Sequence, residues 1–269
     1  MKKAIAKYYR IESAKIAPSD FPIRIVFISD LHNVQVGVHH EGLISKIDAL
    51  KPDLVLLGGD TIIGKPHHSM EDGLEFIAAL GARYRVYAAN GNHEYRLKIY
   101  PETYGNMYER YVKTIEQANI TLLTNEKANI TIGNTQLSIH GLEMAREYYR
   151  RFKKGDLSVN DINNYLGTIA DDNYHILLAH NPRYGKSYMA WGADLTLAGH
   201  YHGGIIRLPK DKPLIGNDFQ LFPPYAYGHY EENNHHLITS AGVGEHTIPL
   251  RINNPREVVV VDLINTQNI

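Results

Sequence analysis

"IRIVFISDLH" (residues 23–32) and "DLVLLGGD" (residues 53–60) are two apolar runs that each end in polar side chains. Uninterrupted apolar runs of this length, bounded by glycine and polar residues, are typical of strands buried on both faces. Between them, "EGLISKIDALK" (41–51) repeats its apolar residues at the spacing of an amphipathic helix. The order strand, helix, strand predicts a βαβ unit that begins a parallel sheet.

Further strands and helices are expected along the rest of the chain. A second amphipathic helix is predicted at 70–82, and 129–139 is typical of a hairpin that turns at Gly133-Asn134. Because the C-terminal apolar runs follow one another with little helix between them, we expect an α/β protein with two stacked mixed β-sheets and helices outside. The chain contains no linker or repeat, which favours a single domain over residues 1–269. The remaining strand-like runs are at 84–93, 135–141, 175–181, 194–204, 235–242 and 257–263.

The composition excludes several classes of function. The net charge of −1 gives no overall field toward nucleic acid, so no specific nucleic-acid partner is expected. The chain has no cysteine, which excludes disulfides, iron–sulfur clusters and a thiol nucleophile, and leaves only nitrogen and oxygen ligands for a metal. Neither a signal-peptide core nor an apolar run of about 20 residues is present, so we expect a cytoplasmic protein that can associate peripherally with a membrane.

Polar side chains follow five of the predicted strands. Each has an ordinary explanation by itself, because Gly-Asp and Asn-Gly are good turn formers and a single histidine is more often a hydrogen-bonded neutral ring than a ligand. All five together at the same ends of strands would require five coincidences, and these ends are where open α/β sheets bind ligands. If the strands continue, the pairs two residues apart point to the same side. The residues are Asp30, His32, Asp60, Asn92, His93, His180, His200 and His202.

This set of residues suits two divalent cations. Cations about 3.5–4 Å apart need a bridging carboxylate, and Asp60 can supply it because Gly58 and Gly59 allow the backbone to approach closely. Asn92 offers a neutral oxygen, which leaves the site positive enough for phosphate. Without cysteine, the expected metals are Mn²⁺, Fe²⁺ or Fe³⁺, and Zn²⁺.

Five sequence blocks, in this order, resemble the calcineurin-like metallophosphoesterases. The resemblance covers residues 25–204 and implies a four-layer α/β/β/α sandwich. The segments 122–142, 205–209 and 237–263 are similar to a bacterial subgroup of small single-domain phosphodiesterases that includes UDP-diacylglucosamine pyrophosphatases. The blocks are "DLH" (30–32), "GGD" (58–60), "GNHE" (91–94), "LLAHNP" (177–182) and "AGHYHGG" (198–204).

The resemblance also implies a role for each residue. One cation is held by Asp30, His32, Asp60 and His202; the other is held by Asp60, Asn92, His180 and His200. A metal-bridging hydroxide attacks phosphorus in line, and the catalytic His93 either binds a phosphate oxygen or protonates the leaving group. The implied reaction is hydrolysis of a phosphodiester or pyrophosphate bond in a phosphorylated small-molecule or lipid-linked substrate. The alternatives are a phosphomonoesterase or nucleotidase with the same site, and a non-catalytic scaffold that keeps the fold.

Two regions vary from the family pattern: an N-terminal extension (1–20) and a lid-like insertion (143–165). The insertion contains "AREYYRRFKK" (145–154), which is typical of a solvated helix face, of a lid that brings cations and aromatic rings over a phosphate, or of a segment that docks on anionic lipid. Arg146 of this stretch, Asn33 after the first block and Tyr201 within the last are candidate substrate contacts. The oligomeric state is not predicted.

Overall fold

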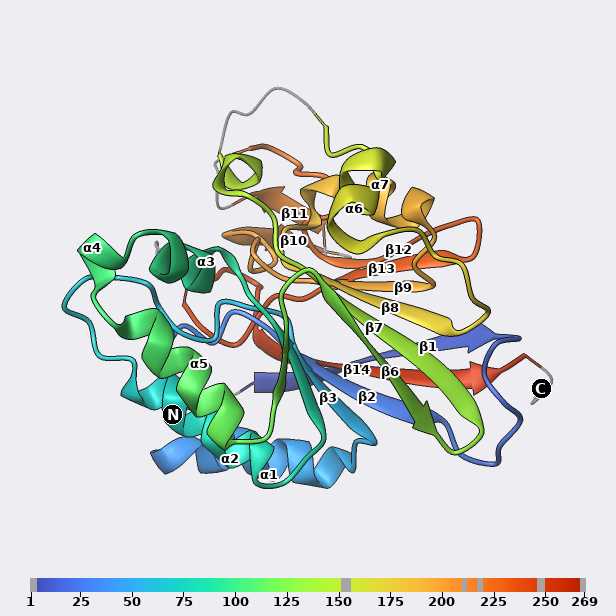
Figure 1. Cartoon of the computed structure of the whole chain (residues 1–269), viewed down its shortest axis with the longest axis horizontal. Coiled ribbons are helices and arrows are strands. Elements are labelled where there is room, and N and C mark those ends of the chain that lie inside the picture. The colour runs from blue at the N-terminus through green and yellow to red at the C-terminus, as the bar shows by residue number, and fades with distance from the viewer. Residues whose placement is uncertain (1–3, 151–155, 210–211, 217–219, 246–249, 267–269) are drawn as a thin grey trace.

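A computed structural model describes residues 4–150, 156–209, 212–216, 220–245 and 250–266. Two six-stranded sheets lie face to face, and helices cover the outer face of each sheet, giving the four layers that the resemblance implies (Figure 1). Both sheets contain parallel and antiparallel pairs, so the predicted α/β class with two stacked mixed sheets is confirmed.

The first sheet has the order β1-β14-β2-β3-β4-β5. Strands β2 to β5 run parallel to one another, β14 is antiparallel to β2, and β1 is parallel to β14. Their apolar side chains face a neighbouring layer on both sides, which explains the uninterrupted runs in the sequence. The strands are β1 (Ala4–Ser13), β2 (Ile23–Ile28), β3 (Leu54–Leu57), β4 (Val86–Ala89), β5 (Thr121–Leu123) and β14 (Arg256–Asn265).

The second sheet has the order β12-β13-β9-β8-β7-β6. Its four central strands are parallel, and β12 and β6 are antiparallel at the two edges. The expected hairpin is the β6–β7 pair, which turns at Gly133 and Asn134. The strands are β6 (Glu126–Ile132), β7 (Thr135–Leu142), β8 (Tyr174–Ala179), β9 (Leu195–Ala198), β12 (Gly228–Glu232) and β13 (His235–Thr239). A separate antiparallel pair consists of β10 (Ile206–Leu208) and β11 (Lys212–Ile215).

Three large apolar clusters and one small cluster of Met189, Ala198 and Leu237 lie among the described residues. The first lies between the helices α1, α2 and α5 and the first sheet, the second between the two sheets, and the third between the second sheet and α6 and α7. The helices are α1 (Glu41–Leu50), α2 (Glu71–Gly81), α3 (Asn92–Ile99), α4 (Pro101–Tyr104), α5 (Met107–Gln117), α6 (Val159–Leu166) and α7 (Gly185–Trp191). Short 3₁₀ turns are at Val38–His40, Arg146–Tyr149 and Pro182–Tyr184.

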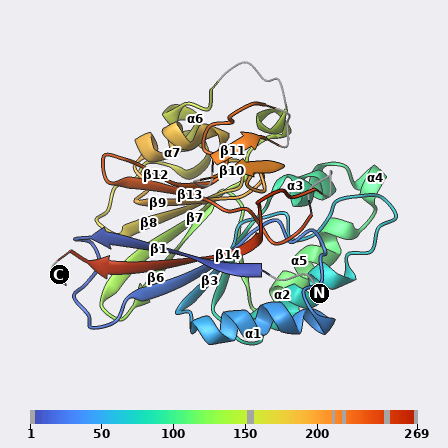
Figure 2. The same cartoon turned by 180° about the vertical axis from the view of Figure 1, so that it is seen from behind.

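The segment expected to be an N-terminal extension is part of the first sheet. Residues Ala4–Ser13 pair in parallel with Arg256–Asn265 along their whole length, so the chain's two ends lie in neighbouring strands (Figure 2). Ala4 and Ile11 of this strand are buried, whereas Ile5, Tyr8, Arg10 and Glu12 are exposed, which fits an edge strand that is partly open to solvent.

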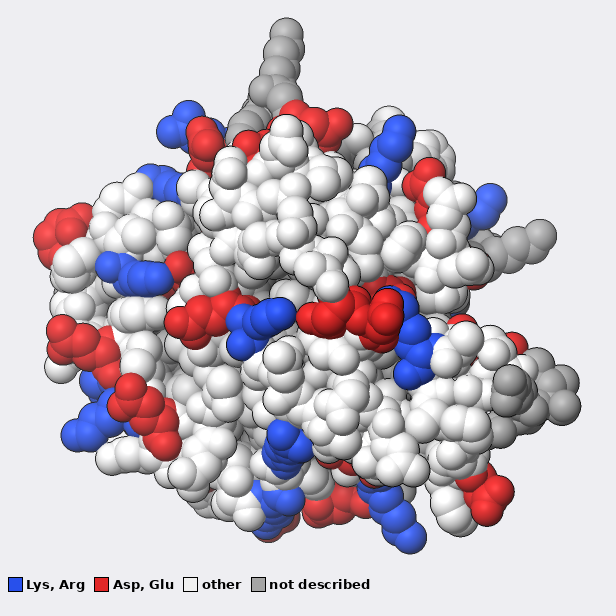
Figure 3. Space-filling model, turned by 45° about the vertical axis from the view of Figure 1, so that its right-hand side comes forward, with Lys and Arg blue, Asp and Glu red and all other residues white. Residues whose placement is uncertain are grey.

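On the face in Figure 3, acidic and basic side chains are interspersed over a mostly uncharged surface. Among the described residues, no helix combines the length and apolar character that a bilayer span requires.

Candidate metal centre

The predicted ligand residues come together where the carboxyl ends of the two sheets meet. Each lies in a loop or at a helix start directly after a parallel strand, so the backbone of both sheets positions them. Asp30 and His32 follow β2, Asp60 follows β3, Asn92 and His93 open α3 after β4, His180 follows β8, and His200 and His202 follow β9.

The sequence predicted that the alternation of side chains along a strand orients the pairs Asp30/His32 and His200/His202, but the structure places neither pair in a strand. Strands β2 and β9 end at Ile28 and Ala198, before the pairs begin. The ligand residues instead adopt left-handed backbone conformations, which non-glycine residues rarely take. The φ angles are 53° for Asp30, 49° for His32, 53° for Asp60, 64° for His200 and 49° for His202. The prediction was wrong about the local geometry because surrounding contacts, not local sequence, impose these conformations.

Backbone hydrogen bonds hold the first two ligand loops against each other. The N–H of Asp30 donates to the carbonyl oxygen of Gly59 at 3.0 Å, and the N–H of His32 donates to that of Asp60 at 3.0 Å. Gly59 has a φ of 89°, and a Cβ at this position would lie 2.3 Å from the backbone nitrogen of Gly91. The loops after β3 and β4 therefore touch through their backbones, as the two glycines before Asp60 predicted.

One group of ligand atoms consists of Asp30, His32 and His202, whose candidate donor atoms lie within 4.8 Å of one another. The Nε2 atoms of His32 and His202 are 3.2 Å apart, and Nε2 of His202 is 3.4 Å from Oδ1 of Asp30. All three side chains are buried or nearly so. Such spacing between nitrogen and oxygen donors is short enough for a single cation to contact all three.

A second group consists of Asp60, His180 and His200, again within 4.8 Å. Nε2 of His180 is 3.1 Å from Oδ2 of Asp60, and the same carboxylate oxygen is 3.8 Å from Nε2 of His32 in the first group. Asp60 therefore lies between the two groups. His200 and His202 are divided between the groups in the way the resemblance implies.

Two buried atoms test whether a divalent cation fits. Nδ1 of His180 lies 2.7 Å from the carbonyl oxygen of Gly58, which can only accept, so Nδ1 carries a hydrogen. The other ring nitrogen, Nε2, faces Asp60. Among the described residues, Oδ1 of Asn92 is buried and lacks a hydrogen-bond partner, and Nε2 of His180 is buried and faces the carboxylate of Asp60 at 3.1 Å. Unsatisfied buried donors and acceptors are costly, and a cation would use both atoms. The residues present fit the implied metals.

The charges of the centre also favour cations. Burial lowers the pKa of His180, but the carboxylates of Asp60 and Asp30 outweigh it and raise that pKa to about 10. Burial opposes ionisation of Asp60 as well, yet the surrounding histidines hold its pKa well below the usual range. In the chain without metal, a proton on His180 therefore supplies the positive charge that a bound cation would supply.

His93 lies beside this centre, and its ring nitrogen Nδ1 contacts groups outside the centre. Its Nδ1 accepts from the backbone N–H of Gly64 at 2.8 Å and lies 2.9 Å from Nη2 of Arg96, which can only donate. The neutral ring therefore carries its hydrogen on Nε2, which is 3.9 Å from Oδ2 of Asp60. Burial lowers the pKa of His93 to about 3, so the ring is a neutral donor near pH 7.

Glu94 orients the loops that carry the ligand residues. Its carboxylate is fully buried and accepts from the backbone N–H groups of Asp60 at 2.8 Å, Gly91 at 2.9 Å and Ile62 at 3.2 Å. Burial and the nearby charge of Asp60 raise the pKa of Glu94 to about 7. One side chain thus joins the two loops that follow β3 and β4.

A cavity of about 250 Å³ opens next to the second ligand group. Of the candidate substrate contacts, Arg146 lines it. Arg96 and Tyr95 also line it and were missed in the sequence, although Arg96 is one helical turn after His93 and thus on the same face of α3. Arg151, Lys153 and Lys154 of the predicted lid lie outside the described part of the chain. The lining residues are Asn92, Tyr95, Arg96, Arg146, Tyr149, Arg150 and His200.

The other two candidate substrate contacts are not brought to this cavity. The side-chain amide of Asn33 donates to the carbonyl oxygen of Ser69 at 2.7 Å, so it holds the start of α2 instead. Tyr201 is only 2% exposed, and its hydroxyl oxygen accepts from Nε of Arg183 at 3.3 Å. The aromatic ring that does border the cavity beside His200 is Tyr149, with ring centroids 5.5 Å apart.

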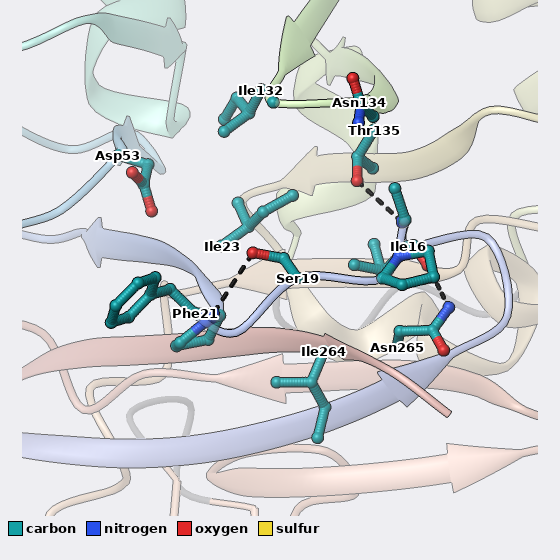
Figure 4. A pocket seen from close by; sticks show the side chains of 14 residues that line it. Ile16, Ser19, Phe21, Ile23, Asp53, Ile132, Asn134, Thr135, Ile264 and Asn265 are labelled. Carbon is teal, nitrogen blue, oxygen red and sulfur yellow. Dashed lines mark hydrogen bonds between the residues drawn. The ribbon is translucent and has the colours of Figure 1, made fainter. Parts of the chain in front are cut away.

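A second cavity, of about 290 Å³, lies at the opposite ends of the strands (Figure 4). Its lining includes Ile23 at the start of β2, Asp53 just before β3 and the turn at Asn134. The carboxylate of Asp53 accepts from the backbone N–H of Arg24, and the lining contains no lysine, arginine or histidine. This cavity offers no chemistry for a phosphate and is separate from the metal ligands.

Comparisons with known proteins agree with the geometry. Residues 23–204 match the family model described as calcineurin-like phosphoesterase. A Caenorhabditis elegans protein named as a metallophosphoesterase, F40B5.2, is 28% identical over 90% of this chain, and the chain spans 48% of that protein's length. Phosphodiesterase YaeI of Escherichia coli is 27% identical over 90% of this chain and 83% of its own. UDP-2,3-diacylglucosamine pyrophosphatase LpxG of Chlamydia muridarum is 26% identical over 71% of this chain and 66% of its own.

Proposed function

This chain belongs to the calcineurin-like phosphoesterase family, and from that premise we propose that it hydrolyses a phosphodiester or pyrophosphate bond with the help of two divalent cations. The observation that carries the proposal is the position of Asp60 between two groups of histidine and aspartate ligands. A carboxylate in this position can bridge two cations, the arrangement that phosphate ester hydrolysis uses.

Each cation would have four protein ligands. Asp30, His32, Asp60 and His202 would hold the first, and Asp60, Asn92, His180 and His200 would hold the second. Bound divalent cations supply Lewis-acid activation of water and of the phosphoryl oxygens. Nitrogen and oxygen ligands without thiolate suit Mn²⁺, Fe²⁺ or Fe³⁺, and Zn²⁺.

His93 would donate a hydrogen bond from Nε2 to a phosphoryl oxygen. Its Nδ1 is occupied by Gly64 and Arg96, and its lowered pKa keeps the ring neutral. A neutral imidazole is a poor proton donor to a leaving group, whereas a fixed N–H that stabilises developing negative charge is effective. This favours the first of the two roles left open by the sequence.

A phosphodiester or pyrophosphate substrate is favoured over a monoester by two considerations. The relatives named above include a phosphodiesterase and a pyrophosphatase. In addition, the cavity beside Asn92 and His200 leaves room for the part of a substrate beyond the scissile phosphate. We propose a phosphorylated small molecule or lipid-linked compound as the substrate class.

The proposal is tested with protein stripped of metal and reloaded with Mn²⁺, Zn²⁺ or Fe²⁺. Hydrolysis of bis(p-nitrophenyl) phosphate should be absent in the stripped protein and return on reloading. Faster hydrolysis of p-nitrophenyl phosphate than of the diester would instead favour the phosphomonoesterase alternative. Failure of every metal to bind in a titration would favour the non-catalytic scaffold.

A further inference from the structure

Three arginines line the cavity of about 250 Å³ beside the second ligand group. Arg96 comes from α3, while Arg146 and Arg150 come from the segment around the 3₁₀ turn after β7. None of the described residues that line the cavity is acidic, although the whole chain has a net charge of −1. Three guanidinium groups therefore converge from two separate parts of the chain on one small space.

These arginines have no carboxylate partner among the residues that the structure describes. Arg146 donates to the hydroxyl of Tyr100 and lies over its ring, with 5.1 Å between the guanidinium carbon and the ring centroid. Arg96 contacts His93 through Nη2, and its Nε is buried without a hydrogen-bond partner. The neighbouring carboxylate of Glu143 is already bound by Lys98 at 2.6 Å.

Guanidinium groups with free donors in a cavity match the geometry and charge of a phosphate group. The unpartnered Nε of Arg96 is a buried donor that such a group would satisfy. The position of the cavity relative to the metal ligands also supports a phosphate-binding role. Asn92 and His200 border the same cavity, so an anion held there would be next to a phosphate bound at the second cation.

Aromatic rings complete the walls. The ring of Tyr149 lies 5.5 Å from that of His200 and 6.3 Å from that of His180, measured between centroids. Tyr95 lines the cavity from α3. Aromatic rings therefore border the space between the arginines and the metal ligands.

We propose that this cavity is a subsite for a second phosphate group, and that the substrate is a pyrophosphate-linked compound such as a nucleoside diphosphate ester. This inference rests on the proposed function. In the proposed reaction water would add to one phosphorus of the substrate, the bond from that phosphorus to the bridging oxygen would break, and one proton would be released to solvent. The second phosphate leaves with the bonding electron pair, and Arg96, Arg146 and Arg150 bind its added negative charge.

The kinetic test compares substrates with one and with two phosphate groups. Arg146→Gln and Arg150→Gln change exposed side chains, so they should leave the fold intact. Arg83→Gln, at an exposed position just after α2, removes the same charge as a control. The double variant should raise KM for UDP-glucose by roughly tenfold or more, since hydrogen bonds to charged groups are among the stronger ones. Hydrolysis of bis(p-nitrophenyl) phosphate, which has no second phosphate group, should fall by a clearly smaller factor than hydrolysis of UDP-glucose. Equal effects on both substrates would overturn the proposal.

A binding measurement separates this proposal from the proposed function. In the Mn²⁺-loaded protein, α,β-methylene-ADP should bind at least about tenfold more tightly than AMP, and the Arg146→Gln/Arg150→Gln variant should lose that difference. Equal affinity of the two nucleotides in the unchanged protein would refute the subsite even if diesters are hydrolysed. Absence of all hydrolysis would refute the proposed function, while the nucleotide comparison would still decide on the subsite.

The pyrophosphate group can come from a soluble or a lipid-linked compound. Comparing UDP-glucose with CDP-diacylglycerol in detergent micelles distinguishes the two sources. In either case the preference over bis(p-nitrophenyl) phosphate should depend on Arg146 and Arg150. A preference that both glutamine substitutions leave unchanged would contradict the subsite.

Discussion

The backbone N–H of His93 donates to Oδ1 of Asp60 at 2.8 Å, so the first turn of α3 is fastened to the carboxylate that lies between the two ligand groups. The other oxygen of that carboxylate, Oδ2, faces His180 and His32. Asp60 therefore connects the residue proposed to donate to the substrate with the residues proposed to hold the cations. Substitutions of these two residues should have different effects on metal content.

Replacing Asp60 should remove both metal and activity. Asp60→Asn keeps the size of the side chain but removes the charge that both cations would share, so metal content should fall to background and turnover by at least about 100-fold. Metal is measured by elemental analysis after reloading, and folding by thermal unfolding. Asp20→Asn, an exposed position, is the matched control. Retention of two metals by the Asp60 variant would rule out a bridging role.

Replacing His93 should lower turnover and leave the metals in place. His93→Ala removes the Nε2–H donor, and the loss of one fixed donor to a developing charge typically costs about 10²–10³-fold in kcat. His93→Gln retains an N–H group and should recover part of the rate. The exposed His68→Ala serves as control. Loss of metal in His93→Ala would assign His93 to the ligands instead.

Replacing Glu94 should weaken the metal centre indirectly. In the unchanged protein, backbone N–H groups donate to the carboxylate of Glu94. Glu94→Gln replaces one of its oxygens with an N–H₂ group, which cannot accept these bonds, so the free energy of unfolding should fall by about 1–3 kcal/mol. Because the same loops carry Asp60 and Asn92, metal affinity should fall by about 10–100-fold. Urea unfolding and metal titration measure the two effects, with Glu41→Gln on the exposed start of α1 as control. Unchanged metal affinity would limit Glu94 to a role in stability.

Much of the fold could be predicted from the sequence because strands buried on both faces must be continuously apolar. The ligand residues were identifiable because each follows such a strand. The left-handed conformations of Asp30 and His202 could not be predicted, since they depend on backbone contacts between loops far apart in the chain. The strand Ala4–Ser13 lies at an edge, where its alternating pattern is a weaker signal.

The candidate substrate contacts were harder to predict for the same reason. Tyr201 and Asn33 lie next to ligand residues in the sequence, but after a left-handed residue the following side chain can point away from the site. Tyr201 is buried, and Asn33 bonds to Ser69. Arg96 and Tyr149, which do line the cavity, reach it through helix geometry and through packing of the segment after β7. Proximity in sequence was a poor guide to proximity in the site.

The last prediction concerns His140, which is remote from the ligands and buried between layers. Its Nε2 lies 3.0 Å from Nδ1 of His175, whose own Nε2 lies 3.0 Å from Oδ1 of Asp171, and its ring packs edge-on against Trp191. Among the described residues, Nδ1 of His140 has no hydrogen-bond partner. Burial lowers the pKa of His140 to about 4, from about 6.5 in an unfolded chain.

This shift predicts a loss of stability in acid. Because the unfolded chain binds the proton more tightly, the contribution of neutral His140 is complete above pH 6.5 and declines as the pH falls from 6.5 toward 4. Between pH 7.5 and pH 5.0 the loss from this group should be about 2 kcal/mol. Urea unfolding of metal-free protein at the two pH values should show a correspondingly smaller decline for His140→Leu, whereas the exposed His67→Leu should behave like the unchanged chain. An identical decline in His140→Leu would mean that other groups account for the acid sensitivity.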